Sequence, residues 1–393
     1  MEPKIRFKGF EGEWKAPLFS EMVERISASG QAGMLPGVEF EDIASGEGCF
    51  NKNIYQKECH KYGKLFYEGD ILFGKLRPYL KNIILADFNG VAIGDFWVLR
   101  SKGLDEKYLY TLVNSESFLK VANISSGSKM PRADWNLVST TKFVVPSAKD
   151  EQKAIGKYFT YLDSQISAST SRLASLKQMK AASLQAMFPQ EGETVPKIRF
   201  KGFEGEWTWL KLGDISEQVK RKAPINSTAP VMMISALNGF INQSEKYSDN
   251  NAGSSLANYT LLKKGELSYN HGYSKTRNFG SCFNLLVEEA RIPFVYHSFR
   301  LTNDNDSFYA YYLNSGTKDK DLKRLVSSTA RMDGLLNISF KNYMELSVPH
   351  PSLAEQQAIA NYFTSLDRQI SLQYQRLEKL KQIKSACLDK MFV

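Results

Sequence analysis

The sequence predicts a protein of the α/β (α+β) class, in which two mixed α/β domains are joined by two long antiparallel coiled-coil helices. Three observations lead to this prediction. The chain has 393 residues, about the length of two ordinary domains. A twelve-residue segment occurs twice without any change, and a long helical segment also occurs twice. The arrangement is therefore an internal repeat with expected pseudo-twofold symmetry.

The first repeat is the segment PKIRFKGFEGEW, which occupies residues 3–14 and again residues 196–207. The second repeat covers residues 151–188 and 355–392, where 22 of 38 aligned positions are identical without a gap. Between these repeats only short similarities remain, such as GDILF from Gly69 and GELSY from Gly265. The intervening regions are thus expected to be one fold that carries two different surfaces. This order predicts a first domain over residues 1–147, a first long helix over 148–189, a linker over 190–195, a second domain over 196–351 and a second long helix over 352–393.

The variable regions contain both strand-like and helix-like stretches. Residues 65–73, 90–100 and 292–301 are rich in β-branched and aromatic side chains and are bounded by turn residues, which predicts strands. Residues 107–122 have the apolar spacing of a helix. Each variable region is therefore expected to be mixed α/β.

The long repeated segments have the apolar spacing of helices with one facing seam. Asp150 and Ser352 lie near the expected helix starts, where short polar side chains cap open N–H groups. Each seam contains one polar residue, Ser169 in the first helix and Gln373 in the second. Since an apolar stripe is stable only when it is packed, we expect the two helices to pack on each other. The seam residues are Ile155, Phe159, Leu162, Ile166, Leu173 and Leu176 in the first helix, and Ile359, Phe363, Leu366, Ile370, Leu377 and Leu380 in the second.

Several classes of protein are disfavoured by the composition and by missing motifs. The sequence contains no run of about eighteen apolar residues, so it predicts no membrane span, and the charged N-terminus is unlike a secretory signal. Four cysteines without a CxxC pair argue against zinc sites and disulfides, and favour the cytoplasm. The sequence has no phosphate-binding GxxxxGK[ST] loop and no glycine-rich loop with the tetrapeptide of a base methyltransferase. We therefore expect no catalytic residues, no metal and no cofactor in this chain.

Basic and aromatic side chains gather in two loops, and the net charge of +9 fits a nucleic-acid partner. Arginine reads guanine, asparagine reads adenine and lysine contacts phosphates, so these side chains suit DNA recognition. A solvated basic loop is the alternative interpretation. The candidates are Lys75, Arg77, Tyr79 and Lys81 in GKLRPYLKN, and Asn270, Tyr273, Lys275, Arg277 and Asn278 in NHGYSKTRNFGS.

A second pair of candidate segments is SSGSKMPR from Ser125 and SSTARMDG from Ser327. Small hydroxyl residues followed by a basic residue in both halves suggest a shared phosphate contact. A plain surface turn is the alternative. The candidates here are Ser126, Lys129 and Arg132 in the first segment, and Ser328 and Arg331 in the second.

Taken together, four features resemble the specificity subunit of a type I restriction-modification system. They are the duplicated PKIRFKGFEGEW, the EQ-x-x-I opening of each long helix, the preceding Val145-Pro146 and Val348-Pro349, and the two divergent blocks. The resemblance covers essentially the whole chain. It implies two target-recognition domains, each of which reads one half of a split double-stranded DNA sequence. It also implies two antiparallel helices that hold two methyltransferase (modification) subunits, with restriction/translocase subunits joining through the complex.

In that family catalysis belongs to the partner subunits. The resemblance therefore implies that adenine DNA methylation from S-adenosylmethionine, and ATP- and Mg²⁺-dependent translocation and cleavage, are supplied by the partners for host defence. This chain is then a non-catalytic, cytoplasmic subunit with no membrane partner. Three alternatives stay open: a self-contained DNA-modifying enzyme, a stand-alone nucleic-acid-binding protein that includes RNA among its targets, and a structural coiled-coil protein without restriction-modification partners.

Overall fold

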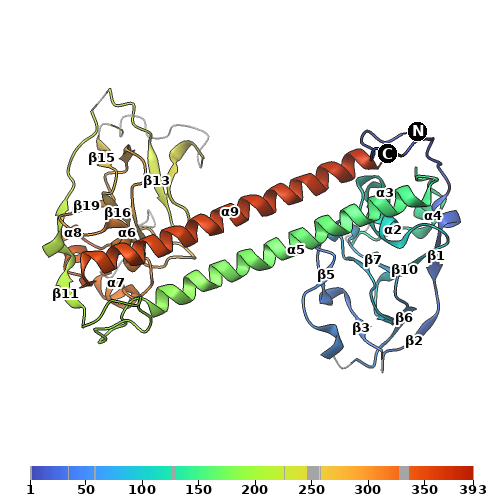
Figure 1. The fold of residues 1–393 in the computed structure, drawn as a ribbon, viewed down its shortest axis with the longest axis horizontal. Helices are drawn as coiled ribbons and strands as arrows, with labels where there is room; N and C mark the ends of the chain where they lie inside the picture. The colour runs from blue at the N-terminus through green and yellow to red at the C-terminus, as the bar shows by residue number, and fades with distance from the viewer. Residues whose placement is uncertain are drawn as a thin grey trace. The chain divides into compact units, whose positions relative to one another are not determined.

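The computed structural model describes residues 2–33, 35–56, 59–124, 130–224, 226–245, 256, 258–326 and 336–392. The chain divides into unit 1, Met1–Ser171 with Tyr374–Val393, and unit 2, Arg172–Gln373. Helix α5 (Lys149–Ala186) begins in unit 1 and ends in unit 2, whereas α9 (Leu353–Met391) begins in unit 2 and ends in unit 1. Each unit thus holds one variable region, the start of one long helix and the end of the other (Figure 1).

Unit 1 is built on two four-stranded sheets with short helices beside them. The first sheet has the antiparallel order β1-β10-β7-β8, and the second has the order β2-β6-β9-β3 with only the β3 pair parallel. The strands of these sheets are β1 (Val23–Ile26), β2 (Ser29–Gln31), β3 (Gly37–Val38), β6 (Tyr62–Phe66), β7 (Ile71–Gly74), β8 (Ile83–Leu85), β9 (Gly90–Ala92) and β10 (Phe96–Ser101). The remaining elements are α1 (Phe19–Met22), η1 (Phe40–Asp42), β4 (Ile43–Ala44), β5 (Cys49–Phe50), η2 (Ile54–Gln56), η3 (Pro78–Leu80), α2 (Glu106–Val113), α3 (Glu116–Ala122) and α4 (Trp135–Thr140).

Unit 2 repeats the first sheet with the order β12-β19-β16-β17, again antiparallel. The pairs β13-β14 and β15-β18 stand in place of the second sheet, and β11-β20 forms a further two-stranded pair. Its strands are β11 (Thr208–Lys211), β12 (Ser216–Gln218), β13 (Met232–Ser235), β14 (Gly239–Asn242), β15 (Thr260–Lys263), β16 (Leu267–Asn270), β17 (Ser281–Asn284), β18 (Glu289–Ile292), β19 (His297–Leu301) and β20 (Ser347–His350). Its helices besides α9 are η4 (Leu212–Ile215), η5 (Gln243–Glu245), α6 (Asp306–Leu313), α7 (Asp319–Leu325) and α8 (Phe340–Met344).

The mixed α/β class and the two long helices confirm the predicted fold. Three local predictions differ from the structure. The stretches 65–73, 90–100 and 292–301, each predicted as a strand, contain parts of two strands each: β6 and β7, β9 and β10, and β18 and β19. Residues 107–122 form two helices because Ser115 starts a new one, and its Oγ accepts a hydrogen bond from Phe118 N at 3.4 Å. Asp150 lies inside the first turn of α5, which begins at Lys149, whereas Ser352 Oγ does accept from Glu355 N at 3.3 Å.

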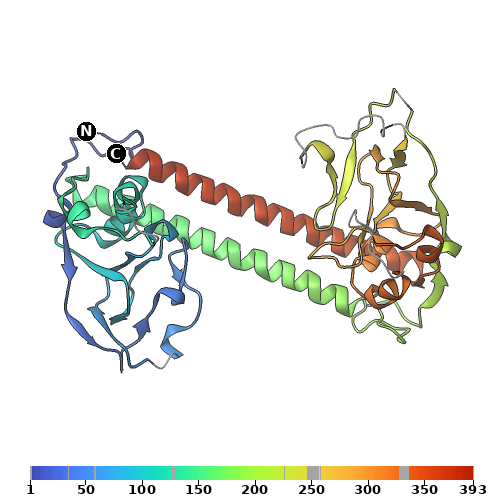
Figure 2. The same ribbon diagram turned by 180° about the vertical axis from the view of Figure 1, so that it is seen from behind.

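The two long helices pack antiparallel within each unit. In unit 1, Asp163 of α5 pairs with Lys384 of α9 at 2.5 Å. In unit 2, Lys180 of α5 pairs with Asp367 of α9, also at 2.5 Å. Figures 1 and 2 show the helices side by side in both units. Nine seam residues are buried, while Ile166, Ile370 and Leu380 are half-buried; Ser169 and Gln373 are buried polar residues.

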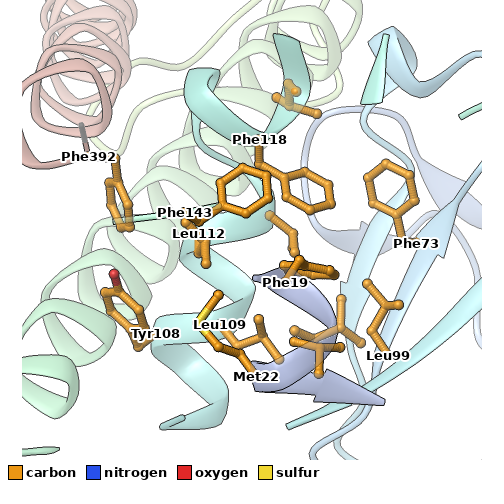
Figure 3. Close-up of a cluster of buried hydrophobic side chains, with 14 of the residues drawn as sticks. Phe19, Met22, Phe73, Leu99, Tyr108, Leu109, Leu112, Phe118, Phe143 and Phe392 are labelled. Atoms are coloured by element: carbon orange, nitrogen blue, oxygen red, sulfur yellow. The ribbon is translucent and has the colours of Figure 1, made fainter. Parts of the chain in front are cut away.

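Each long helix also ends inside a hydrophobic core. Phe392, just after α9, packs against the rings of Tyr108 and Phe159 in unit 1 (Figure 3). Phe188, just after α5, packs against Phe308, Tyr312 and Phe363 in unit 2. Phe188 and Phe392 are the last aromatic residues of the two copies of the long repeat. The repeated phenylalanine therefore does the same job in each unit, which is to pack the end of a long helix into the core.

The identical twelve-residue segment fastens the start of each long helix. Arg6 forms a two-pronged ion pair with Glu151 at 2.7 and 2.8 Å, and its guanidinium also donates to Gly12 O and Glu11 O. Arg199 and Glu355 form the same pair in unit 2 at 2.6 and 2.7 Å. Both carboxylates are 1% exposed. This contact uses the arginine side chain and the backbone turn of the segment, so it accounts for the recurrence of the arginine in both copies.

Candidate nucleic-acid interface

The two basic loops occupy the same position in the two units. Loop 75–82 connects β7 to β8, and loop 271–280 connects β16 to β17, the third and fourth strands of sheets with the same order. The backbone beside each loop also matches. Lys75 O accepts from Ala133 N at 2.9 Å, and His271 O accepts from Leu336 N at 2.8 Å. The stretches paired by sequence are therefore structural counterparts.

The unit 1 loop has a backbone that turns sharply at two basic residues. Arg77 and Lys81 have φ values of 50° and 54°, a left-handed conformation that non-glycine residues adopt at some cost. Hydrogen bonds offset that cost, since Arg77 N donates to Pro131 O at 2.8 Å and Gly46 N donates to Lys81 O at 3.2 Å. As a result Arg77 is exposed and Tyr79 is 55% exposed, both available to a partner.

Lys75 and Arg132 are held together by one carboxylate. Asp95 lies 3.3 Å from Lys75 Nζ and 3.0 Å from an Arg132 guanidinium nitrogen. Burial disfavours the charged carboxylate, but hydrogen bonds from Arg132 and Lys75 outweigh it and lower the pKa of Asp95. These two candidates therefore anchor the loop, in contrast to the exposed Arg77.

A hollow of 470 Å³ adjoins the unit 1 loop. Its two ammonium groups, from Lys81 and Lys120, and the amide of Asn123 suit a nucleic-acid backbone. Sequence reasoning missed Lys120 and Asn123, although they come just before the SSGSKM segment. The hollow is lined by Tyr79, Lys81, Glu116, Leu119, Lys120, Asn123 and Ile124.

The unit 2 loop is a hairpin with a tight tip. Ser274 and Arg277 exchange backbone hydrogen bonds of 3.1 and 3.2 Å, which places Lys275 at the tip. Lys275 and Asn278 are exposed, and Tyr273 is 62% exposed. The hairpin thus presents an ammonium, an amide and an aromatic ring to solvent.

Two other candidates of this hairpin are engaged within the unit. Asn270 Nδ2 donates to Ile234 O at 3.2 Å, and Asn270 Oδ1 accepts from Gly272 N at 3.0 Å. Arg277 is half-buried, and burial lowers its pKa although Asp319 opposes the shift. Asn270 therefore shapes the hairpin, and Arg277 is less available than Lys275.

The remaining four candidates, Ser126, Lys129, Ser328 and Arg331, lie outside the described residues. Within the described part of the chain, no three His, Cys, Asp or Glu side chains are grouped as a metal site requires. No helix in that part has the length and apolar character to cross a membrane.

Comparisons with known proteins give consistent results. Residues 204–382 match the family model of the type I restriction modification DNA specificity domain. Over 120 residues the chain is 26% identical to the type I restriction enzyme EcoDI specificity subunit of Escherichia coli. That match covers 29% of this chain and 27% of the relative, so it spans about a quarter of the relative's length.

Two solved structures share the fold over nearly the full chain. The S subunit of a type I restriction-modification system from M. genitalium has a TM-score of 0.63 at 16% identity, covering 100% of this chain and 99% of its own. A chain from a study of complex assembly and conformational transition in a type I R-M system has a TM-score of 0.50 at 17% identity, covering 98% and 99%. At these identities the likeness concerns the fold.

Proposed function

We propose that this chain is a type I restriction-modification specificity subunit, and that it recognises a bipartite duplex DNA site with one half-site read by each unit. One observation carries the proposal. The two units keep the same four-stranded sheet order, while the loops between the third and fourth strands expose different polar side chains, Arg77 in unit 1 and Lys275 with Asn278 in unit 2. A shared framework with different loops is what the reading of two different half-sites requires.

The side chains of the two loops and of the adjoining hollow divide into two chemical roles. The guanidinium of Arg77 suits the O6 and N7 acceptors of guanine, and the amide of Asn278 suits adenine. The ammonium groups of Lys81, Lys120 and Lys275 suit phosphates, which position the protein without reading bases. Each unit thus offers one group for base edges and at least one for the backbone.

We further propose that the chemistry belongs to partner subunits. Two methyltransferase subunits, with bound S-adenosylmethionine, would methylate adenine, and restriction/translocase subunits would use ATP and Mg²⁺. The absence of cofactor-loop motifs from the sequence supports a non-catalytic role for this chain, and we propose that it acts in the cytoplasm. The family match does not favour the alternative of a stand-alone nucleic-acid-binding or structural coiled-coil protein.

The proposal is tested by exchanging residues 37–142 for the equivalent region of a relative. The exchange replaces the unit 1 loop and leaves loop 271–280 unchanged. Sequencing of methylated adenines in cells that carry the hybrid and its methyltransferase should then show one altered half-site and one retained half-site. A change in both half-sites, or a methylation pattern that does not depend on this chain, would contradict the proposal.

Point variants test the loops directly. We expect Lys275→Ala to weaken DNA binding by the methyltransferase-containing complex. The slope of log affinity against log salt concentration should fall by about the value of one phosphate contact. The matched control is Lys201→Ala, which removes the same charge from an exposed position in the repeated segment of unit 2. Equal losses for the two variants would show that overall charge, and not the hairpin, carries binding.

A further inference from the structure

A short turn in unit 2 carries two exposed apolar side chains. The turn, residues 293–296, joins β18 to β19 and is closed by a hydrogen bond of 3.1 Å from Tyr296 N to Pro293 O. Phe294 and Val295 occupy its two central positions. Phe294 is 56% exposed and Val295 is 37% exposed. The turn therefore holds an aromatic ring and a valine at the surface.

The turn lies beside hairpin 271–280. Strands β16 and β19 are antiparallel neighbours, so the end of β16, where the hairpin begins, and the start of β19, where the turn ends, lie at the same edge of the sheet. The two segments also touch, since His271 Nε2 lies 2.9 Å from Val295 O. The turn that carries Phe294 therefore adjoins the hairpin that presents Lys275 to solvent.

The hairpin continues the ladder of β16 and β17 as a two-stranded ribbon. Asn270 pairs with Ser281 in the sheet, and Ser274 pairs with Arg277 four residues further along each strand, in the same register. A two-stranded ribbon fits the major groove of DNA, where the four base pairs differ most in the groups they present. The turn at the base of this ribbon is thus placed beside a segment that suits the major groove.

The position of Phe294 distinguishes it from other exposed apolar side chains. Ile292 and Tyr296, on either side, are buried in a hydrophobic cluster and anchor the turn, so the Phe294 ring is not needed to fix it. Single exposed apolar residues are common, and Leu286 is 75% exposed. Leu286 follows β17, at the end of the strand away from the hairpin. Phe294, in contrast, lies at the edge that carries the candidate interface.

Unit 1 has a different corner at the same place. Since GDILF aligns with GELSY, the pairing of β10 with β7 and of β19 with β16 puts Gly94 where unit 2 has Phe294, and Asp95 where it has Val295. Gly94 has no side chain, and the carboxylate of Asp95 pairs with Lys75. Of the two corners, the one in unit 2 is apolar and the one in unit 1 is polar.

Thymine is the base that an apolar group recognises. It alone presents a methyl group, on C5, in the major groove, and phenylalanine is among the side chains that contact this group. The ammonium of Lys275 and the amide of Asn278 form hydrogen bonds and do not detect a methyl group, whereas an aromatic ring gains free energy by covering it. Phe294 thus offers a kind of base discrimination that the polar side chains of the hairpin do not.

We propose that Phe294 is a specificity-determining residue of unit 2, whose ring covers the C5 methyl group of one thymine in the half-site that unit 2 reads. The proposal rests on the proposed DNA recognition. A hairpin that lies along the major groove places turn 293–296 over the neighbouring base pairs, and Val295 extends the apolar surface. Unit 2 thereby requires a methyl group that the corner of Gly94 and Asp95 does not require in unit 1.

Deoxyuridine tests this contact, because it keeps the hydrogen-bonding groups of thymidine and lacks the methyl group. The exchange of residues 37–142 first identifies the half-site that unit 2 reads, which is the one retained. Each thymine on either strand of that half-site is then replaced in turn, and binding of the methyltransferase-containing complex to each duplex is measured. We expect one replacement to weaken binding about fourfold, the effect of one buried methyl group. No weakening at any thymine would overturn the proposal.

Three variants assign the effect to the ring. With Phe294→Ala, the sensitive duplex and its deoxyuridine version should bind equally well. Phe294→Leu should keep part of the difference, because leucine is also apolar. Leu286→Ala is the matched control, since it removes an exposed apolar side chain away from the hairpin, and it should keep the whole difference. A fourfold difference that persists in Phe294→Ala would mean that another group covers the methyl group, and the proposal would be wrong.

The outcomes also separate this inference from the proposed function. Deoxyuridine in the half-site of unit 1 should have the same effect on wild type and on Phe294→Ala. Recognition of both half-sites without any deoxyuridine effect that depends on Phe294 would contradict the role of Phe294 alone. Binding that does not depend on the sequence of either half-site would instead contradict the proposed function.

Discussion

The loops 75–82 and 271–280 leave the same sheet position, yet different contacts hold them. In unit 1 the carboxylate of Asp95 gathers Lys75 and Arg132. In unit 2 the ring of His271 bridges the carbonyls of Val295 and Leu336. The contacts that fasten the long helices, by contrast, are the same in both units. The comparison teaches that the framework is fixed by duplicated contacts, whereas each loop is anchored by contacts of its own.

The largest expected difference between the units concerns the aromatic residues after the long helices. Phe188 is completely buried and touches three rings, while Phe392 is 6% exposed and touches two. Phe188→Ala should lower the free energy of unfolding by about 4 kcal/mol, and Phe392→Ala by less. Urea denaturation of the full chain measures both. A larger cost for Phe392→Ala would show that the chain end contributes more than its contacts indicate.

The next difference lies in the duplicated ion pair. Glu355 accepts a third hydrogen bond, from Trp207 Nε1 at 3.1 Å, whereas Trp14 Nε1 finds no acceptor among the described residues. Glu355→Ala leaves the Arg199 guanidinium without its carboxylate and Trp207 Nε1 without its acceptor, and should cost about 3 kcal/mol, more than Glu151→Ala. Glu355→Gln keeps an acceptor for the indole and should cost less than Glu355→Ala. Thermal unfolding of the three variants gives the order of their stabilities. Equal losses of stability for Glu355→Ala and Glu151→Ala would show that the hydrogen bond from Trp207 adds nothing.

The parts predicted from the sequence are those that depend on local periodicity. The three-and-four spacing of Ile155, Phe159 and Leu162 is a property of the chain alone, and these residues are buried as a seam requires. The sequence did not show that Ile155, Phe159 and Leu162 also belong to the hydrophobic core of unit 1. That packing depends on tertiary contacts with the sheet domain, which local periodicity does not reveal.

The loop anchors were not predictable for the same reason. Asp95 is separated from Lys75 and Arg132 by 20 and 37 residues, and nothing in its local sequence marks it as their common partner. Lys120 becomes relevant only because α3 packs beside Tyr79. The break between α2 and α3 was readable, since a serine followed by an acidic residue is a helix-start signal that the apolar spacing masked.

The anchor of the unit 1 loop gives a smaller, pH-dependent effect. Asp95→Asn removes the charge that Lys75 and Arg132 share and should cost about 1 kcal/mol at neutral pH. Because the pKa of Asp95 is lowered in the folded state, this stabilisation is present above the unfolded-state pKa and is lost as pH falls through the folded-state value. The difference between wild type and variant in urea denaturation should therefore begin to shrink as pH falls below about 4, and it should vanish only below the lowered folded-state pKa. A difference that persists in acid would mean that hydrogen bonding by the neutral side chain holds the loop.

The smallest expected effect compares the two ion pairs between the long helices. Asp163 with Lys384 and Lys180 with Asp367 are related by the repeat and have equal distances. In the described part of the chain only the second pair has a tyrosine hydrogen bond, because Tyr311 OH donates to Asp367 at 2.9 Å; the Tyr311 ring also lies 5.4 Å from Lys180 Nζ. The tyrosine restricts both side chains of that pair, so less conformational entropy is lost when they meet.

Double-mutant cycles with alanine separate the two pairs. The pair of Asp163 and Lys384 should give a coupling energy of about 0.5 kcal/mol, the usual value for a partly exposed pair, and the pair of Lys180 and Asp367 about 1 kcal/mol. Repeating the second cycle in Tyr311→Phe, which keeps the ring and removes the hydroxyl, isolates the hydrogen bond. The coupling should then fall toward that of the first pair, by the part that the hydrogen bond from the hydroxyl contributes. If the coupling stays unchanged in Tyr311→Phe, the aromatic face and not the hydroxyl distinguishes the two ends of the helix pair.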